Sequence, residues 1–366
     1  MIFGGRSQEH DVSVITGVLT LNSLDKTIFS PIPVYVDKDG VWYTGEGLNN
    51  IANFKSDKLL KGLKRVALFP GDDRLYEVEK RVKPIAKIAC AVNCMHGRNG
   101  EDGTVSAVFK LSADPLASPD VFPSAMSMDK DVCKLCLKAM GIPTVDGVTI
   151  ERSTYFADVK GKIKRLEKLG YPLIVKPCSS GSSIGVSVAK DGEQLEAALA
   201  KAFTFDVKTL VEKFVDGFHD VNCACFKADG VTYASELEMP FGGEFLSFSD
   251  KYSGSKGGGR RVFPAKLDGS LTEKIRATTI AVYERFQFNG IVRFDYLVKG
   301  EEYYLNEINS VPGSLAYYLF CDKLSDFTRL LTKLIVDGQR YSREYFNTQF
   351  AFSSSILQLD GIGVKK

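Results

Sequence analysis

The stretch that says most about the fold is Gly290-Ile-Val-Arg-Phe-Asp-Tyr-Leu-Val-Lys-Gly-Glu-Glu-Tyr-Tyr-Leu-Asn-Glu-Ile-Asn309. It contains two runs with β-strand patterning, and Lys299-Gly-Glu-Glu302 separates them. Two such runs joined by a short glycine-containing segment predict a β-hairpin. Because side chains alternate between the two faces of a strand, Arg293 and Asp295 should lie on the same face.

The second strand of this hairpin carries a matching polar face. Glu307 and Asn309 also share one face, and a tight turn brings Asp295 opposite either Asn306 or Glu307. The pattern alone leaves both registers open. In one of them two carboxylates and an amide converge, and three oxygen ligands that leave coordination positions open suit Mg²⁺ shared with substrate phosphates. The alternative is that these are exposed polar positions of a half-buried hairpin.

A loop rich in serine and glycine is a candidate phosphate-binding site. Tyr171-Pro-Leu-Ile-Val-Lys-Pro177 predicts a strand closed by proline, and Pro177-Cys-Ser-Ser-Gly-Ser-Ser-Ile-Gly185 follows it. Small residues let the backbone approach a phosphate, and successive N–H groups with serine hydroxyls can surround it. The loop lacks the spacing of a P-loop or of a dinucleotide-binding turn. Alone it is a weak signal, because such loops are often only turns.

A glycine-rich segment further on is a candidate lid. It reads Ser253-Gly-Ser-Lys-Gly-Gly-Gly-Arg-Arg261 and is preceded by Asp250-Lys-Tyr252. Adjacent glycines form no stable element, and the surrounding cations would gather where an anion arrives. A mobile lid over a polyphosphate explains both features. A disordered surface loop explains them almost as well.

The N-terminal part of the chain reads as an open α/β domain. Ile2-Phe3 predicts a first strand that we expect to be trimmed, since only two apolar residues precede the turn at Gly4-Gly5. An amphipathic helix follows. Residues 32–43 predict a hairpin, and the apolar run from Ile85 to Met95 ends at the polar loop His96-Gly-Arg-Asn-Gly-Glu-Asp-Gly-Thr104. Strands that end in polar loops predict a site at the strand ends.

Beyond this domain the chain reads as two further units of helices and strands. The Pro-rich and Ser-rich stretch 114–127 is the first plausible boundary. The additional elements predicted from periodicity are helices at 130–140, 192–202 and about 271–286, and a strand at 209–212.

Composition excludes several classes of protein. With 44% hydrophobic and 25% charged residues, the 366-residue chain is expected to form two or three globular cores. Its 47 basic and 45 acidic residues leave a net charge of only +2, which does not give the positive field that nucleic acid or an anionic membrane requires. No signal sequence or membrane-spanning run is present. We therefore expect a cytoplasmic protein with small-molecule substrates.

Taken in order, these segments resemble the D-alanine-D-alanine ligase family over nearly the whole chain. The landmarks are Gly4-Gly-Arg-Ser-Gln-Glu-His-Asp-Val-Ser13, residues 96–104, Met128-Asp-Lys130, Val175-Lys-Pro177 with Gly181-Ser-Ser-Ile-Gly185, Lys251-Tyr252, Arg293-Phe-Asp295 and Asn306-Glu-Ile-Asn-Ser-Val-Pro-Gly313. The resemblance implies an ATP-grasp protein, α/β and α+β, with three domains. These would be an N-terminal open α/β substrate domain (1–124), a central ATP-grasp subdomain (125–214) and a C-terminal ATP-grasp subdomain with the metal site and the lid (215–366).

The resemblance also assigns residues to ATP and to magnesium. It implies ATP as co-substrate and two Mg²⁺ ions, with Mn²⁺ as a substitute, held by Asp295, Glu307 and Asn309. Glu212 would hold the adenine edge, and Lys251 would reach the γ-phosphate from the lid. The full set of implied ATP-binding residues is Lys130, Lys176, Ser182, Ser183, Glu212 and Lys251.

The implied reaction joins two D-amino acids through an acyl phosphate. A carboxylate oxygen of the first attacks the γ-phosphate, and the amine of the second then attacks the acyl carbon. Arg293 and the Gly313 backbone N–H would stabilise the tetrahedral intermediate. Glu9 would receive the first substrate's ammonium, and the hydroxyls of Ser182 and Tyr252 would be linked to it. The other implied substrate-binding residues are His96, which otherwise only caps its loop, Ser314 and Tyr318.

Three positions depart from the family pattern. Tyr318 stands where the family has a serine that binds the second substrate's carboxylate, so D-serine or another amine is an alternative second substrate. His219 takes the place of a ribose-binding glutamate, and Asp220 is the candidate substitute. The loop Pro115-Leu-Ala-Ser-Pro-Asp120 lacks the family's glycine, so its backbone must differ.

The leading hypothesis is thus a homodimeric ligase that makes D-alanyl-D-alanine for peptidoglycan synthesis. The hypothesis from another class is a nucleotide-binding relative that has lost catalysis. The complete sets of metal ligands, phosphate-binding lysines and oxyanion arginine argue against it.

Overall fold

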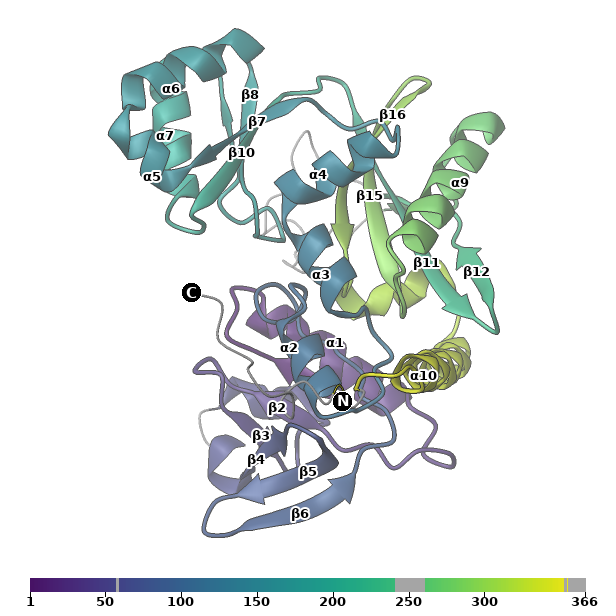
Figure 1. Cartoon of the computed structure of the whole chain (residues 1–366). Coiled ribbons are helices and arrows are strands. Elements are labelled where there is room, and N and C mark those ends of the chain that lie inside the picture. The colour runs from purple at the N-terminus through teal and green to yellow at the C-terminus, as the bar shows by residue number, and fades with distance from the viewer. Residues whose placement is uncertain (57–58, 241–260, 352–353, 355–366) are drawn as a thin grey trace.

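The structure, a computed structural model, describes residues 1–56, 59–240, 261–351 and 354. Within these residues the strands form a six-stranded sheet, two four-stranded sheets and a two-stranded ribbon. Figure 1 shows the N-terminal sheet below the C-terminal four-stranded sheet, while the central four-stranded sheet stands to one side with its helices. No helix in the described part of the chain is long and apolar enough to cross a membrane.

The N-terminal sheet has the strand order β1-β2-β3-β4-β5-β6. Its strands are β1 (Ile2–Gly4), β2 (Val34–Val36), β3 (Trp42–Thr44), β4 (Lys64–Phe69), β5 (Asp72–Val78) and β6 (Val82–Lys87), and its helices are α1 (His10–Ser23), η1 (Ile51–Lys55), η2 (Leu59–Gly62) and α2 (Thr104–Leu111). The short β1 is buried and runs parallel to β2. The predicted hairpin at residues 32–43 is confirmed, because β2 pairs antiparallel with β3.

The apolar run from Ile85 to Met95 is not one strand, which corrects the sequence prediction. Its first part belongs to β6, the exposed edge of the sheet. The chain then passes to the far side of β1, where Ile2 N donates to Val92 O over 3.0 Å and Cys94 N donates to Ile2 O over 2.9 Å. The second part, Ala91 to Met95, is buried beside β1, whereas the first part lies at the exposed edge. The two parts therefore cannot form one continuous strand. The loops that follow β1 and Met95 therefore start at the same edge.

The central sheet has the order β7-β10-β8-β9. Its strands are β7 (Gly147–Glu151), β8 (Leu173–Pro177), β9 (Ser187–Ala189) and β10 (Lys208–Lys213), and its helices are α5 (Arg152–Ala157), α6 (Val159–Leu166), η3 (Glu167–Leu169) and α7 (Gly192–Ala202). The predicted strands at 171–177 and 209–212 and the predicted helix at 192–202 are confirmed. Buried leucine, valine and aromatic side chains from both layers form a core of their own.

The C-terminal sheet has the order β12-β11-β15-β16. The elements of this part are α3 (Val121–Met128), α4 (Lys130–Ala139), β11 (His219–Ala228), β12 (Val231–Ala234), β13 (Met239–Pro240), β14 (Arg261–Val262), α9 (Gly269–Arg285), β15 (Val292–Lys299), β16 (Glu302–Asn309), η4 (Gly313–Leu319) and α10 (Leu324–Phe346). Although α4 precedes the central sheet in sequence, Cys133 and Leu137 pack in the core of the C-terminal sheet. The stretch 114–127 expected as a boundary includes most of α3, which begins where the Asp120 carboxylate caps it.

Helix α10 packs against both the N-terminal domain and the C-terminal sheet. Its side chains Leu330, Leu331 and Leu334 share one core with Phe3 near the N-terminus and with Phe226 of β11. Without a side chain at Gly338, the helix approaches the backbone of residues 116–117 closely.

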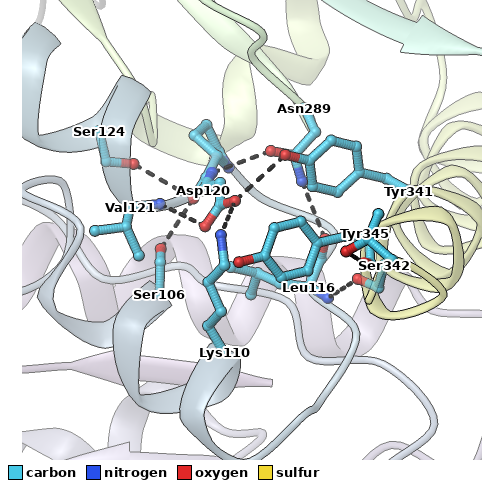
Figure 2. Close-up of polar contacts among 12 residues, drawn as sticks. Ser106, Lys110, Leu116, Asp120, Val121, Ser124, Asn289, Tyr341, Ser342 and Tyr345 are labelled. Atoms are coloured by element: carbon cyan, nitrogen blue, oxygen red, sulfur yellow. Dashed lines mark hydrogen bonds and ion pairs between the residues drawn. The ribbon is translucent and has the colours of Figure 1, made fainter. Parts of the chain in front are cut away.

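A cluster of polar contacts fixes the same junction (Figure 2). The Asp120 carboxylate accepts from Lys110 Nζ of α2 over 2.6 Å and from the Tyr341 hydroxyl of α10 over 3.3 Å. Asn289 Oδ1 accepts from Asp120 N over 3.0 Å, and its Nδ2 donates to Leu116 O over 3.1 Å. The N-terminal domain, α3, α10 and the segment before β15 are thereby held in one arrangement.

Asp114 is expected to make stability depend on pH. The residue is only 2% exposed, and neither carboxylate oxygen has a hydrogen-bond partner among the residues that the structure describes. Burial, and then the charges of Asp73 and Asp72, raise its pKa to about 7. In the unfolded chain the same group ionises near pH 4. Stability should therefore fall as the pH rises from about 4 to 7 and then level off.

Asp114→Asn removes this penalty. Thermal unfolding at pH 8 should show the variant more stable by on the order of 2 kcal/mol, with the difference vanishing toward pH 4. Substituting the exposed Asp216 by Asn in parallel should have no pH-dependent effect. Equal curves for wild type and Asp114→Asn would contradict the assignment.

Candidate active site

One cavity of about 430 Å³ opens between the central sheet, the C-terminal sheet and the N-terminal loops. Of the residues singled out from the sequence, those that line it are Glu9, His96, Lys130, Lys176, Ser182, Ser183, Glu212, Asp220, Arg293, Asp295, Glu307, Asn309, Gly313, Ser314 and Tyr318. His219 is exposed at the start of β11 and is not part of this lining. Lys251 and Tyr252 lie outside the described residues, as does the rest of the glycine-rich segment up to residue 260.

The register of the β15–β16 hairpin sets one wall of the cavity. Asp295 pairs with Glu307 and Arg293 with Asn309, but the next pair is Tyr296 with Leu305. Asn306 is therefore the extra residue of a β-bulge. Because of the bulge, both Asn306 and Glu307 line the cavity, although strict alternation would turn one of them away. The register that the sequence left open is thus resolved, because Asp295 lies opposite Glu307.

The oxygen-rich end of this hairpin has the donor set of a magnesium site. Arg293 holds Asp295 through two hydrogen bonds of 2.7 and 2.8 Å, and Asn309 Nδ2 donates to Asp295 Oδ2 over 2.9 Å. Lys130 Nζ lies 3.6 Å from Glu307 Oε2. Among the described residues no three His, Cys, Asp or Glu side chains gather as metal ligands, so a cation here would rely on the amide oxygen of Asn309 as third ligand.

The opposite wall carries cations at the end of β8. Lys176 Nζ lies 2.6 Å from Glu212 Oε2 and donates to Asn306 Oδ1 over 2.9 Å, so it connects the central sheet to the bulge. Lys130 Nζ donates to Ser180 O over 2.6 Å. Ser182 and Ser183, with φ of 50° and 58°, have the left-handed backbone found in anion-binding loops. This wall is therefore suited to a polyphosphate.

Glu212 is buried between two lysines. Its carboxylate forms ion pairs with Lys134 of α4 and with Lys176. Burial alone would raise the pKa of Glu212, but the two ammonium groups together lower it. Removing one partner would leave an uncompensated buried charge, which is strongly unfavourable. The main role of the Glu212 carboxylate is thus to hold the Lys176 ammonium group in place.

Glu9 meets the serine loop at the N-terminal side of the cavity. Ser182 Oγ donates to Glu9 Oε1, which links α1 to the loop after β8. A Cβ atom on Gly181 would overlap the Glu9 carboxylate, so the close approach requires glycine there. The contact predicted between Glu9 and Ser182 is present in the structure.

His96 supports the loop that contains Gly313. Its Nε2 lies 2.8 Å from Thr16 Oγ1, and Thr16 Oγ1 accepts from Ser314 N over 3.0 Å. Burial, together with a smaller effect of the Arg293 charge, lowers the pKa of His96 to about 4, although a hydrogen bond with the Val311 backbone favours the charged form. The imidazole is therefore neutral at pH 7. Ser314, Leu315 and Ala316 all have positive φ, a strained conformation that persists only where the surroundings enforce it.

Glu101 is a second support that the sequence reasoning quoted but gave no role. Its carboxylate accepts from Gly97 N over 2.7 Å and from Val311 N over 3.2 Å, and so joins the two loops. Burial, and then the charge of Glu9, raise its pKa to about 8. The Glu101 carboxyl therefore holds a proton more readily than an ordinary glutamate.

Sequence reasoning gave no role to several residues of this site, among them Thr16, Glu101, Lys134 and Arg261. Glu101 and Arg261 stand in segments already singled out, so their charges were a usable signal. Thr16 and Lys134 lie on the buried faces of α1 and α4, where only the folded contacts reveal a role.

Two α+β units that enclose one cavity, with lysines and a serine loop facing a carboxylate hairpin, define the class of ATP-grasp ligases. Residues 1–118 match the family model described as D-ala D-ala ligase N-terminus, and residues 136–336 match the D-ala D-ala ligase C-terminus. The chain belongs to the D-alanine-D-alanine ligase family, which confirms the resemblance, the fold class and the class of enzyme predicted from the sequence.

Individual relatives agree with this assignment. A D-alanine--D-alanine ligase of Thermosipho melanesiensis is 35% identical over 343 residues, which cover 92% of each chain. The solved D-alanine-D-alanine ligase of Coxiella burnetii has a TM-score of 0.80 at 24% identity, covers 94% of both chains and supports the fold. The VanG D-Ala:D-Ser ligase of Enterococcus faecalis has a TM-score of 0.76 at 27% identity, over 92% of this chain and 98% of that chain.

Thr16 is expected to be needed for activity although it carries no chemistry. Thr16→Val removes the hydroxyl that holds both His96 and Ser314, leaves two buried polar groups unpaired and should cost about 2 kcal/mol of unfolding free energy. ATP-dependent phosphate release should fall at least tenfold, while Thr16→Ser should retain most of it. Thr20→Val on the same helix, which loses a bond to Thr16 O and a contact with Cys94 but none with His96 or Ser314, is the matched control. Equal activity of the two valine variants would refute this role.

Proposed function

We propose that this chain joins two molecules of D-alanine with hydrolysis of ATP to ADP and phosphate, and so supplies D-alanyl-D-alanine for peptidoglycan synthesis. One observation carries the proposal. Every described residue to which the resemblance assigns a role in the chemistry, from Glu9 to Tyr318, lines the same cavity. The curated relatives, named D-alanine--D-alanine ligase, do not favour the alternatives of another second substrate or an inactive relative.

The ATP end of the cavity would lie between the central and C-terminal sheets. Lys130 and Lys176 would neutralise the phosphates, and the backbone and hydroxyls of Ser182 and Ser183 would surround them. Because the Glu212 carboxylate already faces two lysines, its contact with the adenine edge would come from its backbone. Asp220 lines the cavity, so we assign ribose binding to it rather than to His219.

Asp295, Glu307 and Asn309 would hold Mg²⁺, with two ions per site and Mn²⁺ as a substitute. Their donor set of carboxylate and amide oxygens fits this ion, which would bridge phosphate oxygens and offset the charge that develops during phosphoryl transfer. Arg293 and Lys130 limit the repulsion between the two carboxylates.

The reacting groups would meet at the N-terminal side of the metal site. Glu9 would receive the ammonium group of the first D-alanine. The carboxylate of that D-alanine would attack the γ-phosphate. The Arg293 guanidinium and the Gly313 N–H would then stabilise the oxyanion formed when the second amine attacks the acyl phosphate. His96 would keep the Gly313 loop in position as a neutral imidazole. Lys251 and Tyr252 keep the roles that the resemblance gives them.

Three further proposals concern organisation. We retain the division into domains 1–124, 125–214 and 215–366, with α4 and the end of α3, which belong to the second domain, packing against the sheet of the third. A homodimer through the N-terminal domain is supported by the edge strand β6, which leaves the apolar side chains of Val82 and Ile85 exposed. A cytoplasmic location is supported by the need for ATP.

Product analysis tests the proposed function. The purified chain with ATP, Mg²⁺ and D-alanine should release ADP and phosphate in step with a product of the mass of D-alanyl-D-alanine, and L-alanine should give none. An equimolar mixture of D-alanine and D-serine should give mainly the D-alanine product. Phosphate release without a dipeptide, or only with a different amine, would refute the substrate assignment.

Glu307→Gln tests the metal site. The substitution keeps the shape of the side chain but removes one ligand charge, so half-maximal phosphate release should require at least tenfold more Mg²⁺. Glu302→Gln, at the exposed turn end of the same hairpin, is the matched control and should behave as wild type. An unchanged Mg²⁺ requirement in Glu307→Gln would show that the ion is held elsewhere.

A further inference from the structure

Arg261 is held in a fixed orientation at the edge of the cavity. It begins β14, which pairs with β13, and its guanidinium carbon lies 5.0 Å from the ring centre of Phe263 and 5.1 Å from that of Tyr318. Stacking on aromatic rings restricts the plane of a guanidinium group. A long side chain that would otherwise be mobile is therefore pre-organised.

A buried acid fixes one edge of this guanidinium. Arg261 Nη1 donates to Glu238 Oε1 over 3.1 Å and to Tyr318 O over 3.5 Å. The Glu238 side chain is only 6% exposed, and its Oε2 accepts from Asn222 Nδ2 over 3.1 Å, so the acid cannot follow a moving partner. The Arg261 side chain is 38% exposed and lines the cavity. Within the described chain, Nε and Nη2 make no hydrogen bond, which leaves donors for a ligand.

Tyr318 connects this cation to the reaction centre. Burial raises the pKa of its hydroxyl, and the neighbouring Arg293 guanidinium opposes that effect. The ring of Tyr318 thus has Arg293 near its hydroxyl and Arg261 over its face. The group that attacks at Arg293 is an α-amino group, and its carboxylate is attached to the adjacent carbon. With the amine at Arg293, a carboxylate on the adjacent carbon would lie beside Tyr318 and Arg261.

We propose that Arg261 binds the α-carboxylate of the second amino acid and so determines the specificity of this position. The inference rests on the proposed function and adds to it the residue that selects the nucleophile. The free edge of a guanidinium offers a carboxylate two parallel hydrogen bonds, which gives both attraction and orientation. Where the family's serine would supply this contact, the present chain has a tyrosine ring on which the arginine stacks.

Competition between D-alanine and D-alaninamide tests the proposal. The amide has the same amine and methyl group but no carboxylate. With ATP, Mg²⁺ and both amines present, the masses of D-alanyl-D-alanine and D-alanyl-D-alaninamide report the choice at the second position. Wild type should form mainly the dipeptide. Arg261→Met should lower the ratio of dipeptide to amide product at least tenfold and raise the KM for the second D-alanine, with little change in the KM for ATP.

Two further variants make the result specific. Arg261→Lys keeps the charge without the two-donor edge and should be intermediate, which also separates a binding defect from misfolding. Arg74→Met is the matched control, because Arg74 is likewise bound to an acid, Asp72, and lies 5.5 Å from the ring centre of Tyr76, but outside the cavity. It should behave as wild type.

The outcomes separate this inference from the proposed function. If wild type makes no dipeptide from D-alanine, the proposed function and the role of Arg261 are both refuted. If wild type makes it and Arg261→Met keeps both the product ratio and the KM for the second D-alanine, only the role of Arg261 is overturned. The same holds if the substitution raises the KM for ATP alone.

Discussion

The ammonium group of Lys176 is the contact on which the site depends. It lies between Glu212 in the central sheet and Asn306 in the C-terminal hairpin. Lys134 forms a second ion pair with the Glu212 carboxylate. A charge in such a buried place is tolerated only when it is paired. The two sheets that enclose the cavity are therefore tied together by the group that is also placed to meet a phosphate.

The β-bulge at Asn306 makes this arrangement compatible with the carboxylate site. A regular hairpin would offer the cavity either the amide that binds Lys176 or the carboxylate that faces Lys130, because neighbouring side chains point to opposite faces. The extra residue places both on one wall. The N-terminal domain supports the segment after β16, since Glu101 binds the Val311 backbone before η4 and Thr16 binds the Ser314 backbone in its first turn.

Much of this could be predicted from residue patterns that act locally. The hairpin, the helix at 192–202 and the strand ending at Pro177 follow from periodicity and turn chemistry, and the ordered motifs identified most residues of the cavity. The bulge could not be predicted, because alternation permits two registers and only the folded sheet selects between them. The break in the apolar run between Lys87 and Ala91 could not be predicted either. It depends on the pairing of residues 92–94 with β1, which lies about 90 residues earlier in the sequence. Thr16 and Lys134 gain their roles from partners at distant positions.

The position of α10 has a consequence for how the chain folds as it is synthesised. Residues 324–346 supply leucines to the core that contains Phe3 and Phe226, and Gly338 packs against residues 116–117. Domains generally fold in order from the N-terminus as they leave the ribosome. The part of the N-terminal core that contains Phe3 is therefore completed only after residues 324–346 have been made, whereas the cluster around Ile2 and Phe109 contains no side chain of α10. In the nascent chain the first of these clusters lacks its cover until the helix follows.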